Sequence, residues 1–381
     1  RCVAAIFRPI PVPDVATSRR GVLCPATSRS KALPPARRGK CGGQVRAVSP
    51  ASIERTQRRA MQSIIKRSRQ LRERAEAALL DLRIGLKFRS DRRYLPLTAG
   101  HFDLYRTVHR HSYRELGRFP DLVACRDLND MINWSKLFDQ NPAMVDCTDK
   151  LGVRDYVAAR VGPQHLTEIF QVRDHFAGID FEALPKSFVV KTNNDSGTVI
   201  VVPDKDELDR AEAERLVERA LSQVYGAAHG EWAYAHIVPK VFVEENLADQ
   251  NGASPPDYKF FCAGGKVTYC SYLYGRGTAR RAQAIDPMGN DTGLNAGGFP
   301  YGSQYSRPDN WERMIEVAET LAADFKLVRV DIYSIGERIV VGEMTFWPLA
   351  GAFKGPDLPQ ISRLIDFDRT SVRPPYRAKD R

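Results

Sequence analysis

Short apolar runs that come in pairs, each pair joined by a polar or glycine turn, dominate the chain beyond residue 140. Such pairs predict β-hairpins, because two strands separated by a tight turn pair antiparallel. The predicted strands are 187–192, 198–203, 240–247, the two arms of 258–274 around Gly264 and Gly265, and the two arms of 326–346 around Gly336. Helical periodicity separates them at 150–161, 205–224 and 310–325. This interleaving favours an α+β fold built on antiparallel sheets over a doubly wound parallel sheet.

The charge of the chain is unevenly distributed. Residues 1–100 hold 23 Lys and Arg against 6 Asp and Glu, whereas the remaining 281 residues carry a net charge of −6. The net charge of +11 therefore comes from residues 1–100 and not from the rest of the chain. We predict no nucleic-acid partner. Residues 1–50 are rich in Arg, Ser, Pro, Ala and Gly, which predicts a disordered basic tail. An organelle transit-like segment and a non-native extension with the true start near Met61 are both open interpretations.

Residues 51–134 are predicted to form a basic helical N-terminal region, whose first helix spans 53–87. Apolar residues recur there at steps of three and four, as in an amphipathic helix. Five basic residues surround this stripe: Lys66, Arg67, Arg69, Arg72 and Arg74. Two interpretations remain open, namely a surface helix that docks on the body, and weak contact with an anionic membrane or an acidic polymer.

The cysteine usage and the missing motifs exclude several classes of protein. Seven cysteines without a CxxC pair, an odd number in a long chain, are typical of reduced thiols in a cytoplasmic compartment. No apolar run is long enough to predict a transmembrane helix, so we expect a cytoplasmic protein, peripheral at the inner membrane face if the basic helix binds there. The patterns GxSxG, HExxH, GxxxxGK[ST] and GxGxxG are absent, which argues against serine hydrolases, zinc proteases, P-loop proteins and dinucleotide dehydrogenases.

Charged residues interrupt the two apolar strands of the last hairpin. Arg329 and Asp331 share one face of their strand, because side chains alternate along a strand, and Glu343 lies on the return strand. Two neighbouring carboxylates repel each other unless a cation lies between them, and their hard oxygens suit Mg²⁺. An internal ion pair between Arg329 and Asp331, with Glu343 at the sheet edge, explains the same pattern.

Two further segments have the composition of a nucleotide site. Lys191 ends an apolar strand and precedes the short polar loop Asn193–Gly197, which is able to offer backbone N–H groups to phosphates. Glu244 and Glu245 end the strand 240–247, where a carboxylate is able to bind ribose hydroxyls. Either segment alone is equally typical of an ordinary turn or strand end.

The order of these pieces along the chain resembles the ATP-grasp superfamily, and more closely its teichuronopeptide-biosynthesis-like (TupA-like) family. The resemblance covers about residues 135–355 and rests mainly on the segments DYKFF, VRVDIY and GEMTFWP. It implies an ATP-grasp fold, in which two α+β lobes with antiparallel sheets enclose a nucleotide cleft. The catalytic domain is then 135–358, and residues 359–381 form an irregular C-terminal tail.

The resemblance also implies roles for single residues. Lys150 and Lys191 would contact the nucleotide from the two sides of the cleft, with Glu244 and Glu245 beside adenine and ribose. The flexible loop over the triphosphate would consist of Asn194, Asp195, Ser196 and Gly197. Mg²⁺ would be held by Asp331 and Glu343, with Thr345 where many relatives have an asparagine ligand. Arg329, assisted by Lys259, would stabilise the transition state of phosphoryl transfer.

The activity implied is that of an ATP- and Mg²⁺-dependent carboxylate–amine ligase, which forms an amide through an acylphosphate. The family likeness indicates a role in cell-surface polysaccharide or peptide-polymer biosynthesis, with a small-molecule or polymer carboxylate and an amine as substrates. In close relatives the loop reads HDSGG, whereas this chain has Asn194 and Thr198 at the first and last of these positions. A sugar-transferring enzyme of the same kind of pathway and a non-catalytic nucleotide-binding scaffold remain as alternatives.

Overall fold

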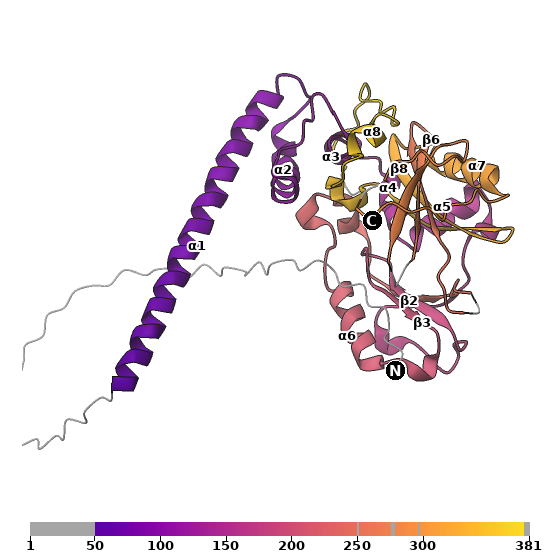
Figure 1. Cartoon of the computed structure of the whole chain (residues 1–381), viewed down its shortest axis with the longest axis horizontal. Helices are drawn as coiled ribbons and strands as arrows, with labels where there is room; N and C mark the ends of the chain where they lie inside the picture. Colours follow the sequence, from indigo (N-terminus) through magenta and orange to yellow (C-terminus); the bar gives the residue numbers. More distant parts are fainter. Residues whose placement is uncertain (1–49, 250, 276–278, 296–297, 377–381) are drawn as a thin grey trace, which may run out of the picture. The chain divides into compact units, whose positions relative to one another are not determined.

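The computed structural model describes residues 50–249, 251–275, 279–295 and 298–376 (Figure 1). The basic tail predicted for residues 1–50 therefore lies, but for its last residue, outside the described part. The described chain belongs to two compact units, of which the first ends at Leu79 and the second begins at Leu80.

The helix predicted over 53–87 is confirmed as α1, which runs continuously from Pro50 to Asp91. Ion pairs between residues four apart stabilise the exposed part of this helix. The Nε of Arg69 donates to Glu73 and the Nε of Arg72 donates to Glu76, each over 2.9 Å. Among the described residues, no helix combines the length and the apolar character needed to cross a bilayer.

The second unit contains the remaining described α-helices, which are α2 (Phe102–Leu116), α3 (Leu128–Phe138), α4 (Ala143–Thr148), α5 (Gly152–Arg160), α6 (Arg210–Leu221), α7 (Trp311–Ala322) and α8 (Leu358–Ser362). The helices predicted over 150–161, 205–224 and 310–325 are confirmed as α5, α6 and α7. The tail predicted as irregular from residue 359 is wrong at its start, because α8 lies there and buries Ile361 and Ser362.

Two antiparallel sheets form the framework of this unit. Sheet A has the order β1-β4-β2-β3, with β1 (Ile169–Arg173), β2 (Phe188–Thr192), β3 (Val199–Val202) and β4 (Val241–Glu244). Sheet B has the order β7-β6-β5-β8-β9, with β5 (Asp257–Ala263), β6 (Lys266–Tyr274), β7 (Arg281–Ile285), β8 (Leu327–Ile335) and β9 (Arg338–Thr345). Every pairing between these described strands is antiparallel, so the predicted α+β class is confirmed. The turn between β5 and β6 and the turn between β8 and β9 have glycine with positive φ, at Gly264, Gly265 and Gly336, as tight turns require.

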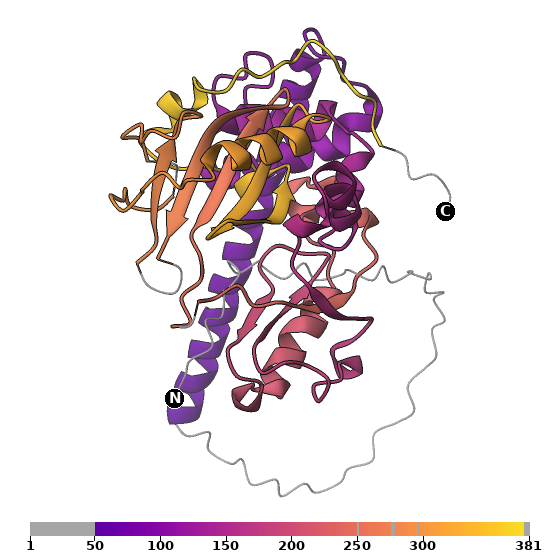
Figure 2. The same ribbon diagram turned by 90° about the vertical axis from the view of Figure 1, so that its right-hand side faces the viewer.

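Sheet A and α6 form a small lobe with its own core (Figures 1 and 2). Phe188 and Val190 of β2 pack in this core with Val243 of β4. Because side chains alternate along a strand, Lys191 and Glu244 are left on the opposite face of the sheet.

Sheet B is covered on one face by α7, whose Trp311 ring lies 5.4 Å from the ring of Phe260. Lys259 neighbours Phe260 in β5 and therefore points to the other face. That other face carries the charged residues of β8 and β9, so the predicted site lies away from α7.

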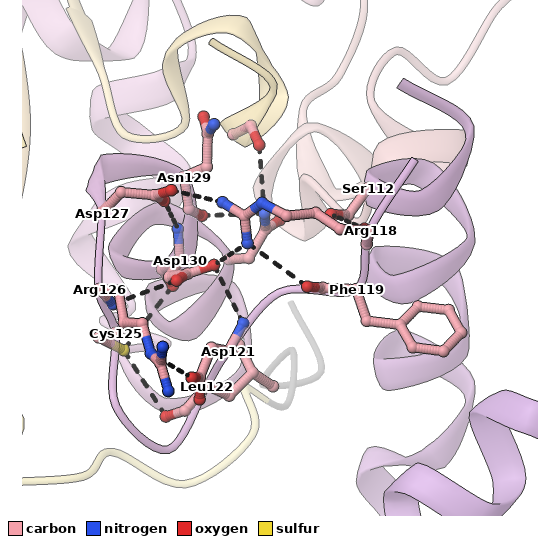
Figure 3. A network of polar contacts seen from close by, with 12 residues as sticks. Ser112, Arg118, Phe119, Asp121, Leu122, Cys125, Arg126, Asp127, Asn129 and Asp130 are labelled. Carbon is pink, nitrogen blue, oxygen red and sulfur yellow. Dashed lines mark hydrogen bonds and ion pairs between the residues drawn. The ribbon is translucent and has the colours of Figure 1, made fainter. Parts of the chain in front are cut away.

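A polar network ties the loop after α2 to the start of α3 (Figure 3). Arg118 donates to Asp130 at 2.8 Å and to Asp127 at 2.5 Å. The carboxylate of Asp130 also accepts the backbone N–H groups of Asp121 and Arg126, at 3.0 and 3.1 Å. Asp130 thus serves as the common acceptor of three donors, and its side chain is 2% exposed.

We expect Asp130→Ala to lower the free energy of unfolding by about 2–4 kcal/mol, because backbone N–H groups and Arg118 lose their acceptor and each such group costs ~1–3 kcal/mol. Urea unfolding followed by fluorescence measures this. The matched control is Lys354→Ala, which removes a 3.1 Å pair with Glu115 whose side chains are 61% and 44% exposed and should cost below about 1 kcal/mol. Equal losses in both variants would contradict the role given to Asp130.

Candidate active site

Three neighbouring strands of sheet B bring the predicted catalytic residues into one cluster. Lys259 of β5 lies opposite Asp331 of β8, and Asp331 in turn lies opposite Glu343 of β9. Arg329 lies opposite Thr345 in the next row of the same face. We call these five residues the carboxylate cluster.

Arg329 links the acidic groups of the carboxylate cluster. Its Nε lies 2.5 Å from one oxygen of Asp331, and its Nη2 lies 2.8 Å from the other. The same Nη2 lies 2.9 Å from Oε1 of Glu343 and 2.9 Å from the hydroxyl of Thr345. Both carboxylates are therefore held on one guanidinium, whose planar fork suits this bridging.

Lysine and threonine complete the cluster. The ammonium of Lys259 pairs with the carboxylate of Asp331. It also lies 3.6 Å from a carboxylate oxygen of Asp257, at the start of the same strand. The hydroxyl of Thr345 donates to Glu343 over 2.8 Å. Burial opposes the charge of Glu343, but Arg329 and Lys259 outweigh it and lower the pKa of Glu343 to about 2. Glu343 is thus an anion at neutral pH.

A pocket that is partly open to solvent lies between the two sheets and α5. Sheet A contributes Lys191, Phe242 and Glu244, and sheet B contributes Tyr333 and residues 340–342. The remaining lining residues are Lys150, Val153, Arg154, Val157, Leu166, Thr167 and Leu247. Apolar walls with two lysines, one arginine and one carboxylate suit a ligand that has a flat apolar part and an anionic part.

The carboxylate of Glu244 is fixed inside this pocket. It pairs with Lys191, and its second oxygen accepts the hydroxyl of Thr167 over 2.7 Å. Arg154 donates in turn to the hydroxyl and the backbone carbonyl of Thr167. The predicted residues Lys150, Lys191 and Glu244 thus line one pocket together.

Glu245, by contrast, does not line the pocket. Its carboxylate forms two bonds to Arg338 of β9, at 2.6 and 2.9 Å. Arg338 also donates to the backbone carbonyl of Leu166 at 3.1 Å. Since Glu245 follows β4 and Arg338 begins β9, this pair connects the end of an inner strand of sheet A to the edge strand of sheet B.

The predicted phosphate loop divides into two parts. Asp195 accepts the hydroxyls of Thr192 and Thr198 at 2.6 and 2.5 Å, so it braces the loop from within. Asn194 is buried and donates to backbone carbonyls at the end of α6, at 3.1 and 3.2 Å. Ser196 and Gly197 are exposed at the tip, and the Lys150 ammonium contacts the backbone carbonyl of Asp195.

The sequence pattern that defines the "TupA-like ATPgrasp" family matches residues 130–357, which is more than half of the chain. The chain belongs to the TupA-like ATP-grasp family. The pocket and the carboxylate cluster both lie within the matched residues.

Solved structures of ATP-grasp ligases resemble this TupA-like protein distantly. A D-alanine–D-alanine ligase from Bacillus anthracis complexed with ATP is 18% identical, with a TM-score of 0.36 over 58% of this chain and 65% of that chain. An L-amino acid ligase from Bacillus licheniformis is 13% identical, with a TM-score of 0.35 over 68% and 58%. The ATP-grasp ligase PsnB, complexed with a phosphomimetic variant of its minimal precursor, Mg and ADP, is 13% identical, with a TM-score of 0.32 over 63% and 62%. The chain covers less than two thirds of each of these proteins. A comparison with curated proteins gives no match.

The donor atoms of the carboxylate cluster suit the Mg²⁺ that the family fold implies. Asp331 and Glu343 offer hard oxygens on adjacent strands, and the Glu343 side chain is 34% exposed. Among the described residues no group of three or more Asp, Glu, His or Cys side chains is arranged to hold a metal. Mg²⁺ is commonly held by one or two carboxylates, with phosphate and water oxygens completing its shell, and this pair meets that requirement.

Several pocket residues were not predicted from the sequence. Arg154 follows Lys150 by four residues, so the helical spacing near α5 was a usable signal. Thr167 and Tyr333 had no sequence signal. They line the pocket only because sheet A and sheet B pack beside each other in the folded protein.

Proposed function

We propose that this TupA-like ATP-grasp protein is an ATP-dependent carboxylate–amine ligase. The observation that carries the proposal is the pairing of two carboxylates on one buried arginine, on the sheet whose β8 and β9 also line a pocket with two lysines. Phosphoryl transfer needs chiefly positioning and charge neutralisation, which these residue types supply.

The proposed reaction has two steps. A substrate carboxylate oxygen attacks the γ-phosphorus of ATP, the bond to the β,γ-bridging oxygen breaks, and ADP and an acylphosphate result. An amine then attacks the acyl carbon, phosphate leaves, and the amine nitrogen loses a proton as the amide forms. Arg329 and Lys259 face the negative charge that develops on the transferred phosphoryl oxygens.

The pocket binds the nucleotide in this proposal. Phe242 and the apolar wall of α5 pack against adenine, and Glu244 accepts hydrogen bonds from the ribose hydroxyls. Lys150 and Lys191 neutralise the phosphates. The exposed tip at Ser196 and Gly197 offers backbone N–H groups, whereas Asn194 and Asp195 hold the loop in shape. Glu245 acts indirectly, through its pair with Arg338 at the pocket edge.

Asp331 and Glu343 are the residues that would hold Mg²⁺, with Thr345 as the hydroxyl beside them. When bound, the ion supplies positive charge to the phosphate oxygens and makes the terminal phosphorus more electrophilic. The chain itself keeps Glu343 ionised and orients both carboxylates through Arg329.

The substrates belong to the finer part of the proposal. We place the carboxylate on a sugar acid or peptide polymer of the cell surface and the amine on an amino acid, as the family likeness suggests. A panel of such pairs, with ADP and phosphate measured together, tests this. Equal amounts of ADP and phosphate that depend on both substrates support the ligase. Release of a nucleoside diphosphate from a nucleotide sugar, or ATP binding without any turnover across the panel, would refute it.

A further inference from the structure

The last turns of α1, from Leu80 onward, belong to the second unit and have two apolar sides, of which only one packs in the core of that unit. Ile84 is fully buried, and the Phe88 ring lies 5.1 Å from the ring of Phe102 and 5.0 Å from that of Tyr105. Leu82 and Leu86 are 61% and 57% exposed. Residues two positions apart lie on nearly opposite sides of a helix. Leu82 and Leu86 therefore point away from the core that buries Ile84 and Phe88.

The same exposed side continues along the helix before Leu79. Its large apolar residues have exposed fractions of 59–65% and recur at steps of three, four, seven and eight residues. Together with the two leucines above they form one line, which we call the exposed stripe: Met61, Ile64, Ile65, Leu71, Leu79, Leu82 and Leu86. A line of this length on one face of a helix is far more than scattered exposed residues.

Positive charge flanks the exposed stripe. Residues 61–79 hold five Lys and Arg against two Glu. The two glutamates are engaged by Arg69 and Arg72 within the helix. Arg67 and Arg74 lie seven residues apart and therefore on the same side of the helix, where they border one edge of the stripe. The surface thus combines an apolar line with a surplus of cations.

These two properties together identify the kind of partner. A second copy of this helix would add like charges beside the stripe, and an acidic polymer would neutralise the cations but leave the apolar line in water. An anionic lipid bilayer satisfies both, because acyl chains accept the stripe and phosphate groups accept the cations. We propose that α1 lies on an anionic lipid bilayer with the exposed stripe at the acyl boundary, and so holds the ligase unit at the membrane surface.

The experiment is vesicle binding by the full chain. Vesicles of phosphatidylcholine with phosphatidylglycerol are compared with vesicles of phosphatidylcholine alone, and sedimented protein is measured. The variant Ile64→Ser, Ile65→Ser, Leu71→Ser should bind at least about 30-fold more weakly, since three side chains lose their burial. Arg67→Gln with Arg74→Gln should weaken binding by roughly fivefold for each arginine. Gln62→Ser with Gln70→Ser, off the stripe, is the matched control and should bind like the parent. Circular dichroism verifies that the helix is retained in every variant.

Binding to the anionic vesicles that the stripe variant loses supports the proposal. Three results would overturn it. One is equal binding of the parent and the stripe variant. Another is capture by polyglutamate without binding to vesicles, which assigns the helix to an acidic polymer. The third is a dimer in light scattering that the stripe variant abolishes, which assigns the stripe to a second copy. None of these readouts depends on ligase activity, so they are independent of the proposed function.

Discussion

Arg329→Lys is expected to lower the turnover number roughly 10²–10³-fold, the usual cost of losing one group that stabilises developing charge. The lysine keeps the positive charge, but its single ammonium is unable to bridge Asp331, Glu343 and Thr345 in the way that the guanidinium does. ATP affinity should change less than about threefold, because Arg329 does not line the pocket in which we propose that ATP binds.

Initial rates of phosphate release with an active substrate pair, together with calorimetric ATP binding, separate these effects. Arg338→Lys is the matched control. Arg338 pairs with Glu245 outside the cluster and is 40% exposed, so we expect its turnover number to fall less than about tenfold. A loss of ATP binding in Arg329→Lys without loss of turnover would contradict the assignment of Arg329 to the chemical step.

Lys191→Met is expected to weaken ATP binding by roughly 10- to 100-fold, in line with the ~1.5–3 kcal/mol of a hydrogen bond to a charged group. Lys191 lines the pocket and is only 22% exposed, so its charge is poorly screened there. Its loss also leaves Glu244 without its cation, which places a negative charge near the proposed position of the phosphates.

A neighbouring lysine offers the control for this change. Lys186 precedes the same strand, is 73% exposed and pairs with Asp204, so Lys186→Met should leave ATP affinity within about twofold. The double variant Lys191→Met, Glu244→Gln should recover part of the affinity, because the uncompensated carboxylate is gone. Equal affinities of Lys186→Met and Lys191→Met would remove Lys191 from the nucleotide site.

The sequence predicted the hairpins well because their signals are local. Gly264, Gly265 and Gly336 mark the turns, and the apolar arms beside them have the length of strands. Strands β1 and β7 were not predicted. Both are five-residue outer strands of their sheets, without a tight turn beside them, and they are defined by the partner that they pair with and not by their own composition.

Helix α3 was missed for a different reason. All of its residues are buried, so it has no polar face and no periodic contrast. Its polar residues point inward instead. Asn129 exchanges bonds with the backbone of Phe353, and the fully buried Lys136 donates to the carbonyls of His229 and Ala350 at 2.8 Å each. Contacts with segments 93 to 224 residues away stabilise this helix, and no local sequence pattern predicts them.

The site shows the same difference between residues with a local sequence signal and residues placed by tertiary contacts. Arg329, Asp331 and Glu343 were predictable because charged residues inside apolar strands are costly without a partner. The hairpin register then places them together. The separation of Glu245 from the pocket was not predictable, since it depends on the position of Arg338 at the start of β9. Whether a side chain enters a pocket between two sheets is a tertiary property.

We propose that the carboxylate cluster and the pocket bind ATP together with Mg²⁺. Calorimetric titration of the full chain with ATP, with and without Mg²⁺, tests it most directly, beside the variant Asp331→Asn, Glu343→Gln. Thermal unfolding verifies that the variant is folded, and Glu343→Gln alone serves if the double change is too destabilising. We predict binding in the parent that Mg²⁺ strengthens and that the variant loses. No ATP binding by the folded parent, or the same Mg²⁺-dependent binding in both proteins, would contradict the claim.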